Sequence, residues 1–357
     1  MDASSLRGEF PALERLAYFN TGTNGPLPQA AARAAERELR QELEQGRTHA
    51  SFDRKSELAS ELREAYASLL HCDTADLALT TCTSEGLAQV LDGLELQAGD
   101  EILTSDEEHP GLLGALGAAR ELRGVSVRMA PLPQITEAVG PRTRLVACSH
   151  VSWVSGLLAP AELSELDVPV VLDGAQGVGA IPVDVGTLRC DAYAGAGQKW
   201  LCGPNGSGML YVSPQLRARL RVTRRGYLDL ADPNEGLAAR PHDDARRFDA
   251  MALSSETLAC ARAAVGVLQA AGLGAVQARA RDLAARLAGE LARRGREPAP
   301  RDDTTLVSFQ SPDPEGERLR LAERAVIVRN IPGRPWLRAS VGGWNSEDDL
   351  DRLLEAL

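Results

Sequence analysis

The chain keeps lysine at only two positions, Lys55 and Lys199, and all the rest of its 39 lysine and arginine residues are arginine. Lys199 lies between a short apolar segment, 191–194, and a turn rich in glycine, 202–208. An amine becomes a nucleophile when it loses its proton, whereas a guanidinium stays protonated and cannot form a Schiff base. Retention of lysine at this position therefore favours a chemical role for Lys199. Lys55 lies in a polar helical stretch and is interpreted as a solvated surface residue.

Two polar features stand upstream of Lys199. Asp173 directly follows the apolar run 170–172, where an unpaired carboxylate is costly and calls for a cationic partner. Thr83 and Ser84 lie where a short apolar run gives way to a helical pattern, and the free amides of a helix N-terminus suit a phosphate. Taken singly, an aspartate that caps the next helix and a serine cap without a ligand explain these residues as well.

Together the three features meet the needs of one cofactor. Pyridoxal 5′-phosphate (PLP) needs a lysine for its aldehyde, a carboxylate that keeps its ring nitrogen protonated, and an anion site for its phosphate. Lys199, Asp173 and the pair Thr83 and Ser84 supply all three groups.

The elements that would position these residues alternate between helices and continuous Val/Leu/Ala runs, which predicts a mainly parallel sheet covered on both faces. We expect strands at 76–80, 101–104, 125–129, 144–148, 168–172 and 191–194, and helices at 28–45, 52–70 and 111–122. Ligands of such sheets gather beyond the carboxyl ends of the strands, where all of the motifs lie.

The alternation of strands and helices ends after residue 211. The segment 214–250 is irregular and rich in arginine, two helices follow at 255–271 and 274–294, and the remainder predicts a small α+β unit. We expect a large domain at 16–250 and a small domain made of 1–15 and 251–357.

Bulk composition excludes several classes of protein. A net charge of −11 argues against a broad nucleic-acid or anionic-membrane surface. The six cysteines show no paired spacing, so we expect no metal site, no disulfides and a reducing cytoplasm. No secretory signal or membrane-spanning apolar run is expected.

The chain resembles the class V aminotransferase family, which includes cysteine desulfurases, cysteine/cystine C–S lyases, kynureninase and isopenicillin-N-epimerase-like proteins. The matching stretches run in family order: 18–22, 81–86, 108–110, 149–152, 172–176, 198–204 and 338–340. The resemblance implies the fold-type-I PLP architecture, with a mainly parallel seven-stranded sheet and a small α+β domain. It also implies a homodimer with the site at the subunit interface.

The resemblance assigns roles to individual residues. Lys199 would bind the cofactor aldehyde and move protons at the substrate Cα, Asp173 would pair with the ring nitrogen, and His109 would stack on the ring. Arg338 would grip the substrate α-carboxylate by a bidentate contact, near Asn20. The remaining cofactor contacts are Gln176 near the phenolic oxygen, and Thr83, Ser84 and Gln198 at the phosphate. A surface histidine and a surface ion pair are the simpler interpretations of His109 and Arg338.

Several positions depart from the family pattern. Gln198 and Ala196 replace a histidine and a serine that are frequent there, and Trp153 aligns with an asparagine near the phenolic oxygen. Ala252 stands where a threonine usually reaches the neighbouring subunit's phosphate. The connection 328–337, where desulfurases carry a persulfide-forming cysteine, contains no cysteine.

The missing cysteine favours a C–S lyase that eliminates a β-substituent from cysteine, cystine or an S-substituted cysteine. Transamination and epimerisation at the same carbanion remain alternatives, because Lys199 and Asp173 serve them equally. A catalytically inert scaffold for a partner protein is disfavoured by the intact Lys199, Asp173 and Arg338. A nucleotide-binding α/β protein is disfavoured because the glycine fingerprints are missing.

Overall fold

A central sheet organises the computed structural model, which describes residues 3–357. Its seven strands stand in the order β2-β8-β7-β6-β5-β3-β4. Their bounds are β2 (Leu77–Thr80), β3 (Glu101–Ser105), β4 (Ser126–Ala130), β5 (Thr143–Ser149), β6 (Val170–Asp173), β7 (Ala192–Ala196) and β8 (Gly208–Val212). Neighbours run parallel, except that β8 is antiparallel to both β2 and β7. The expected mainly parallel seven-stranded sheet is confirmed.

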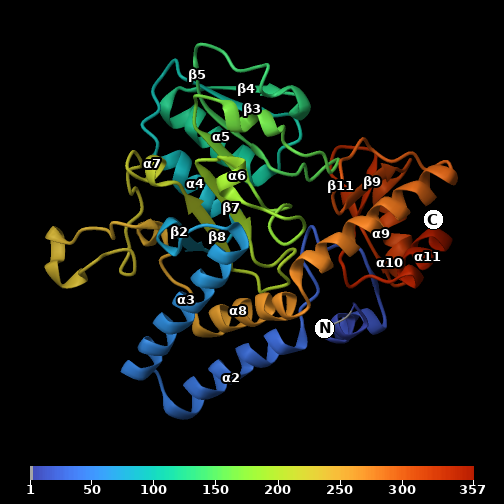
Figure 1. The fold of residues 1–357 in the computed structure, drawn as a ribbon, viewed down its shortest axis with the longest axis horizontal. Coiled ribbons are helices and arrows are strands. Elements are labelled where there is room, and N and C mark those ends of the chain that lie inside the picture. The colour runs from blue at the N-terminus through green and yellow to red at the C-terminus, as the bar shows by residue number, and fades with distance from the viewer. Residues whose placement is uncertain (1–2) are drawn as a thin grey trace.

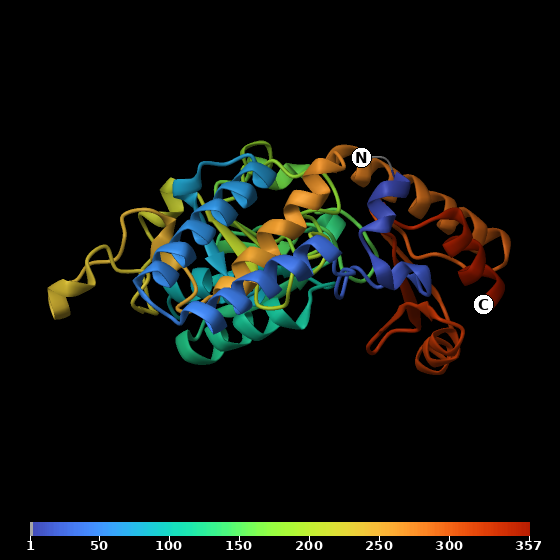
Figure 2. The same cartoon turned by 90° about the horizontal axis from the view of Figure 1, so that it is seen from below.

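Helices cover both faces of this sheet because the strands bury side chains on both sides. In β2, Leu77 and Leu79 join the core beneath α3, whereas Ala78 joins the core beneath α4 and α5. The helices concerned are α2 (Gln29–Gln45), α3 (His49–Leu70), α4 (Thr83–Gly93), α5 (Pro110–Arg123) and α8 (Ser255–Ala270). Figures 1 and 2 show α2, α3 and α8 packed together along one side of the molecule.

Local capping sets the helix boundaries. As expected, α2 ends at Gly46, which has a φ of 74°. α3 begins at His49, three residues before the expected start, because Thr48 and Ser51 form a reciprocal capping box.

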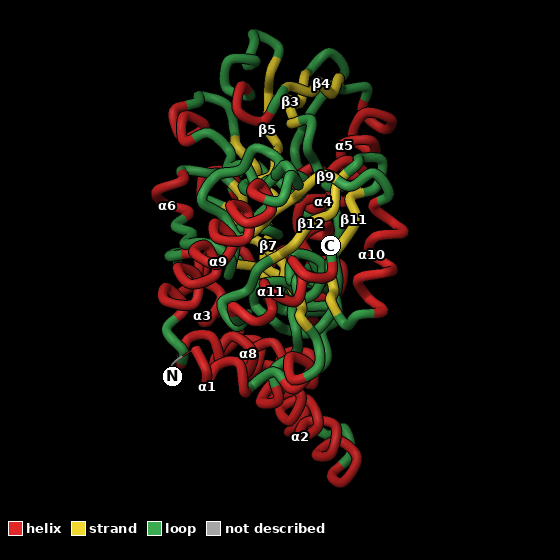
Figure 3. Tube along the Cα trace, turned by 90° about the vertical axis from the view of Figure 1, so that its right-hand side faces the viewer, coloured by secondary structure: helices red, strands yellow, loops and turns green. Residues whose placement is uncertain are grey.

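A second unit lies beside the sheet, on the right of Figure 1 and facing the viewer in Figure 3. Its antiparallel sheet has the order β11-β12-β9, and β1 pairs with β10 in a separate parallel ladder. The bounds are β1 (Ala17–Tyr18), β9 (Leu306–Gln310), β10 (Val326–Ile327), β11 (Arg329–Ile331), β12 (Trp336–Ser340), α9 (Leu273–Arg293), α10 (Pro314–Glu323) and α11 (Glu347–Ala356).

Two features of this unit bear on the expected small α+β domain. The chain passes from the ladder with β1 into the sheet with β12 and so forms two short strands, β10 and β11, in succession. The expected small domain begins with α8, which packs against α2 and α3. The division of the chain at residue 250 stays a prediction.

The N-terminal segment is held against the C-terminal unit. Arg7, in α1 (Ala3–Gly8), forms an ion pair of 2.7 Å with Asp349, and the Phe10 and Trp344 rings lie 5.1 Å apart. Two further short helices are α6 (Val185–Leu188) and α7 (Pro214–Arg217). The segment after α7, yellow in Figure 2, projects from the body of the molecule.

Across the described residues, no single helix has the length and apolar character to cross a membrane. α8 and α9 meet those criteria only as a pair that is bent by 78°.

Candidate active site

A cavity of about 220 Å³ opens at the carboxyl ends of the sheet strands. It brings together eight of the nine residues that the sequence pointed to: Thr83, Ser84, His109, Asp173, Gln176, Gln198, Lys199 and Arg338. Asn20 is the exception, because its backbone pairs with Ser340 while its neighbours Gly22 and Thr23 line the cavity. The role of Asn20 at the substrate stays a prediction.

Lys199 and Asp173 come from neighbouring parallel strands. Asp173 ends β6, where it is the register partner of Ala194, and Lys199 follows the end of β7. Lys199 lines the cavity, but the surrounding protein desolvates its amine and lowers its pKa to about 8, against an opposing effect of Asp173. Burial raises the pKa of Asp173. The charge of Lys199 opposes this rise, and so does the backbone N–H of Ala175, which donates a 2.9 Å hydrogen bond to the Asp173 carboxylate. The lysine can therefore lose its proton near neutral pH.

The anion end of the cavity is the N-terminus of α4. Cys82 caps this helix and Thr83 is its first residue, so N–H groups without intrahelical acceptors face the cavity end of β2. The Thr83 hydroxyl and the Gln198 side-chain oxygen are buried without a hydrogen-bond partner among the residues described. This combination suits a phosphate.

His109 lies at the N-cap of α5, where its Nδ1 accepts a hydrogen bond of 3.0 Å from the Gly111 N–H. Burial, together with the nearby Lys199, Arg329 and Arg338, lowers the pKa of His109 to about 4. The imidazole is therefore neutral at physiological pH and can lie against an aromatic ring without adding charge.

The opposite end of the cavity carries two arginines. Arg338 is only 1% exposed, and its Nη1 donates a 2.7 Å hydrogen bond to the Trp153 carbonyl. Within residues 3–357 it has no carboxylate partner, and burial, reinforced by Arg329, lowers its pKa to about 9. Burying a cation without a paired anion costs free energy, so this end of the cavity favours the binding of an anion.

Arg329 is a cavity residue that the sequence analysis missed. It lies directly opposite Arg338 in the antiparallel pair of β11 and β12, and it lines the same cavity. The sequence held one signal for this residue, the short connection 328–337. A short connection within an α+β unit can form a hairpin, in which residues equally far from the turn face each other.

Gln176 is fixed by two hydrogen bonds on the cavity wall. Its amide nitrogen donates to the Gly22 carbonyl at 2.8 Å, and its oxygen accepts from the Trp200 indole at 2.9 Å. Its proposed contact with the cofactor's phenolic oxygen stays a prediction.

The Aminotransferase class-V family model matches residues 17–353, which is almost the whole chain. The chain belongs to the class-V aminotransferase family. It is 31% identical to isopenicillin N epimerase of Streptomyces clavuligerus, over all of this chain and 98% of that protein. It is 30% identical to a probable cysteine desulfurase of Pseudomonas aeruginosa, over 99% of this chain and 97% of that protein.

Solved structures of class-V enzymes share the fold. The cystine C–S lyase C-DES, in complex with its reaction product cysteine persulfide, superposes with a TM-score of 0.91 and 28% identity, covering 97% of this chain and 98% of that one. A mutant of C-DES that has glycine covalently linked to the PLP cofactor gives a TM-score of 0.90, again with 28% identity and 98% of each chain covered.

PLP is the cofactor typical of this family, and the cavity residues fit it. Lys199 can bind the aldehyde, the buried Asp173 can face the ring nitrogen, and the unpartnered Thr83 hydroxyl lies at a helix N-terminus suited to the phosphate. When bound, PLP supplies an electron sink for a carbanion at the substrate Cα.

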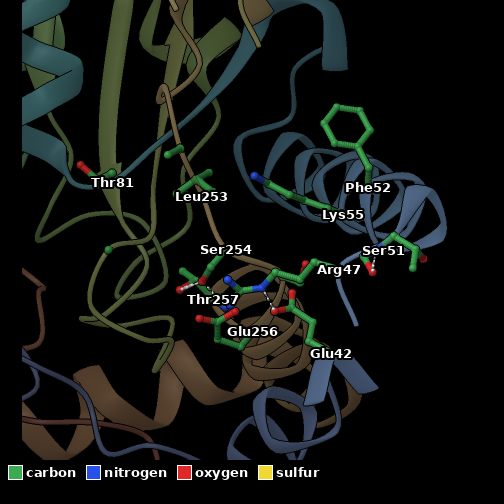
Figure 4. Close-up of a pocket in the computed structure, with 14 residues that line it drawn as sticks. Glu42, Arg47, Ser51, Phe52, Lys55, Thr81, Leu253, Ser254, Glu256 and Thr257 are labelled. Carbon is green, nitrogen blue, oxygen red and sulfur yellow. Dashed lines mark hydrogen bonds and ion pairs between the residues drawn. The ribbon is translucent and has the colours of Figure 1, made fainter. Parts of the chain in front are cut away.

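A larger cavity of about 650 Å³ lies between α2, α3 and the N-terminus of α8 (Figure 4). Lys55 points from α3 toward Leu253, and Arg47 forms a 2.7 Å ion pair with Glu42. No expected site residue lines this cavity, and none of the described carboxylates pairs with Lys55. Lys55 is half-buried at this cavity, and its interpretation as a solvated surface lysine stays a prediction.

Proposed function

We propose that this class-V enzyme is a C–S lyase that acts by β-elimination on cysteine, cystine or an S-substituted cysteine. Arg338 binds the substrate α-carboxylate, and Lys199 takes the proton from Cα. The bond between the β-carbon and sulfur then breaks, and the sulfur leaves with the bonding electrons, as hydrosulfide from cysteine, as cysteine persulfide from cystine and as a thiolate from an S-substituted cysteine. Hydrolysis of the remaining three-carbon fragment gives pyruvate and ammonia.

The observation that carries this proposal is the turn between β11 and β12. The turn occupies residues 332–335, directly beyond strands whose arginines line the cavity, and it has no cysteine; the last cysteine of the chain is Cys260. A reaction that passes sulfur to a protein thiolate needs such a nucleophile near the substrate. β-Elimination needs none, and C-DES, named as a cystine C–S lyase, is similar over nearly the whole chain.

The second arginine supports a substrate with a second acidic group. Arg329 and Arg338 both line the cavity, and neither has an ion-pair partner in the described part of the chain. One α-carboxylate neutralises one guanidinium. Cystine carries two carboxylates, and breaking its bond between the β-carbon and sulfur releases cysteine persulfide, whose terminal sulfur takes the bonding electrons as the leaving group.

An epimerase or aminotransferase acting through the same Lys199 and Asp173 is the second candidate. The 31% identity to isopenicillin N epimerase over the full chain favours the epimerase of these two. In that case Lys199 would remove the Cα proton and the proton would return on the other face, with no bond broken at the β-carbon.

Product analysis distinguishes these reactions. Purified enzyme with PLP is incubated with cysteine, cystine and S-methylcysteine, with Lys199→Ala as the inactive control and Lys55→Arg as the matched lysine control. Pyruvate release that requires Lys199 and is greatest with cystine supports the lyase. Exchange of the Cα proton from solvent without pyruvate supports epimerisation, and conversion of the cofactor to its amine form supports transamination; either result contradicts the lyase.

We also propose that the enzyme works as a homodimer. Exposed apolar side chains lie at and beside the larger cavity. Phe52 lines it and is 45% exposed, Tyr227 is 61% exposed with its ring 6.3 Å from that of Phe52, and Met251, next to the lining residue Ala252, is 58% exposed. Ala252, at the position of the family's phosphate-binding threonine, lines the same cavity. A monomer in light scattering at micromolar concentration, or a Met251→Glu variant that stays dimeric, would count against this interface.

A further inference from the structure

Trp153 stands between the two groups that would flank a bound substrate. Its ring meets the His109 ring edge-on, with centroids 5.1 Å apart, and the Arg338 guanidinium carbon lies 5.9 Å from its ring centroid. The Trp153 carbonyl also accepts the Arg338 Nη1 hydrogen bond. Trp153 therefore forms the cavity wall between the carboxylate end and the ring-stacking histidine.

This wall cannot move aside easily. Behind the indole, Trp153 packs with Val154, Ile331 and Trp336 in a small apolar cluster. Trp336 and Ile331 are register partners at the end of the β11–β12 hairpin, so the backing belongs to regular structure. A change of the Trp153 rotamer would have to displace this hairpin or the buried Arg338.

A carboxylate locks the turn that carries Trp153. Glu107 accepts hydrogen bonds from the hydroxyls of Ser152 and Ser155 through one oxygen. The Ser152 hydroxyl in turn accepts from the backbone N–H groups of Val154 and Ser155, each at 3.1 Å. Glu107 lies two residues before His109, so one side chain ties the Trp153 turn to the loop that carries the histidine.

We propose that Trp153 determines how large a substrate side chain the site accepts, and that Glu107 is the positioning residue that holds this wall in place. The inference rests on the proposed function in one respect, the binding of the substrate carboxylate at Arg338. A cavity of about 220 Å³ that also takes the cofactor leaves a narrow space for the substrate side chain, which admits an extended chain such as that of cystine but not a wide one. Small or slender side chains fit against the indole, and bulky ones collide with it.

Binding of two amine-free acids to the PLP-loaded enzyme tests the wall without any turnover. Propionate and 3-phenylpropionate share the carboxylate and differ in bulk, and calorimetry gives the affinity ratio of the pair. Trp153→Ala should shift this ratio by about tenfold or more in favour of 3-phenylpropionate. Trp153→Phe, which keeps a ring against the same cluster, should shift it much less.

Glu107 is tested with the same ratio. Glu107→Ala should shift the ratio in the same direction as Trp153→Ala, because the turn loses its lock. Glu107→Gln keeps an oxygen that can accept from both serines and should restore the wild-type ratio. A purely structural role would weaken both acids alike in Glu107→Ala and leave the ratio unchanged.

Arg338→Gln separates failure of this inference from failure of the proposed function. Loss of binding of both acids in this variant places the carboxylate at Arg338, and an unchanged ratio in Trp153→Ala would then overturn the present inference alone. If Arg338→Gln binds both acids as wild type does, or if neither acid binds the wild type, the proposed substrate site is wrong and the role of Trp153 falls with it. Circular dichroism confirms that each variant is folded.

Discussion

Arg329 and Arg338 are direct register partners in the antiparallel pair of β11 and β12, and both line the cavity that holds Lys199. Like charges on facing positions of two strands repel one another. In this chain the two repelling charges lie where carboxylates of the substrate would bind. Bound carboxylates would cancel the repulsion, so the hairpin should be more stable when the site is occupied.

Loss of either arginine should affect substrates according to their charge. Arg338→Gln should raise KM about 100-fold for every amino acid, because truncating one partner of a buried charge pair costs about 2–5 kcal/mol. Arg329→Gln should raise KM more for cystine than for S-methylcysteine. Arg334→Gln is the matched control, since Arg334 belongs to the same hairpin but contacts the Asp106 carbonyl outside the cavity. Equal effects of Arg329→Gln on both substrates would contradict a second carboxylate site.

The facing arginines Arg329 and Arg338 also predict that replacing one of them stabilises the ligand-free enzyme. Arg329→Gln removes one of two facing charges, so it should raise the free energy of unfolding of the ligand-free enzyme by up to about 1 kcal/mol. Thermal unfolding at low salt measures the difference, which should shrink as salt screens the repulsion. A variant that is less stable than wild type at low salt would show that Arg329 has a stabilising partner of its own.

Cofactor attachment should depend on one lysine. Lys199→Arg should lose the visible absorbance of covalently bound PLP and at least about 100-fold in activity, because arginine can neither form the covalent link nor act as the base. Lys55→Arg should retain both properties. Difference spectra after gel filtration in the presence of excess PLP provide the measurement. Retained absorbance in Lys199→Arg would move the attachment site elsewhere.

The pH dependence of PLP uptake should report the pKa of Lys199. The neutral amine is the nucleophile, so the rate of uptake by the cofactor-free enzyme should rise with pH and level off above about 8. Asp173 raises the pKa of Lys199 and Arg338 lowers it. Asp173→Asn should therefore move the inflection to lower pH, and Arg338→Gln should move it to higher pH; shifts in the opposite directions would contradict this electrostatic account.

Much of the site followed from sequence because its groups stand at strand ends. A continuous apolar run identifies a buried parallel strand, and the carboxyl ends of such strands meet at one edge. Asp173, Lys199 and Thr83 could thus be placed together without knowledge of any side-chain contact. Their positions directly after apolar runs of the sequence carry this information.

The remaining features depend on contacts between side chains that are distant in sequence. Glu107 accepts hydrogen bonds from Ser152 and Ser155, which lie 45 and 48 positions further along the chain, and no local sequence pattern marks these contacts. Arg329 was hidden because the sequence placed it in the connection 328–337, where an arginine is most often a surface residue. For Asn20, a family-like stretch identified the loop, and Gly22 and Thr23 of that loop line the cavity, while the role of Asn20 itself stays a prediction.

The loop before α2 predicts a last, steric test. Gly25 donates its N–H to the Gln198 carbonyl at 2.8 Å, and a Cβ at this position would lie 2.2 Å from the Lys199 carbonyl oxygen. Gly25→Ala should therefore displace the backbone at Lys199, lowering the unfolding free energy by about 1–3 kcal/mol and weakening PLP binding. Gly114→Ala is the control: Gly114 lies within α5 with nothing within 4 Å of its Cβ position, so alanine should stabilise that helix by about 0.5–1 kcal/mol. Urea unfolding and PLP titration of both variants measure the contrast. If Gly25→Ala matched Gly114→Ala in both measurements, the loop would be free to retreat and would not support the lysine.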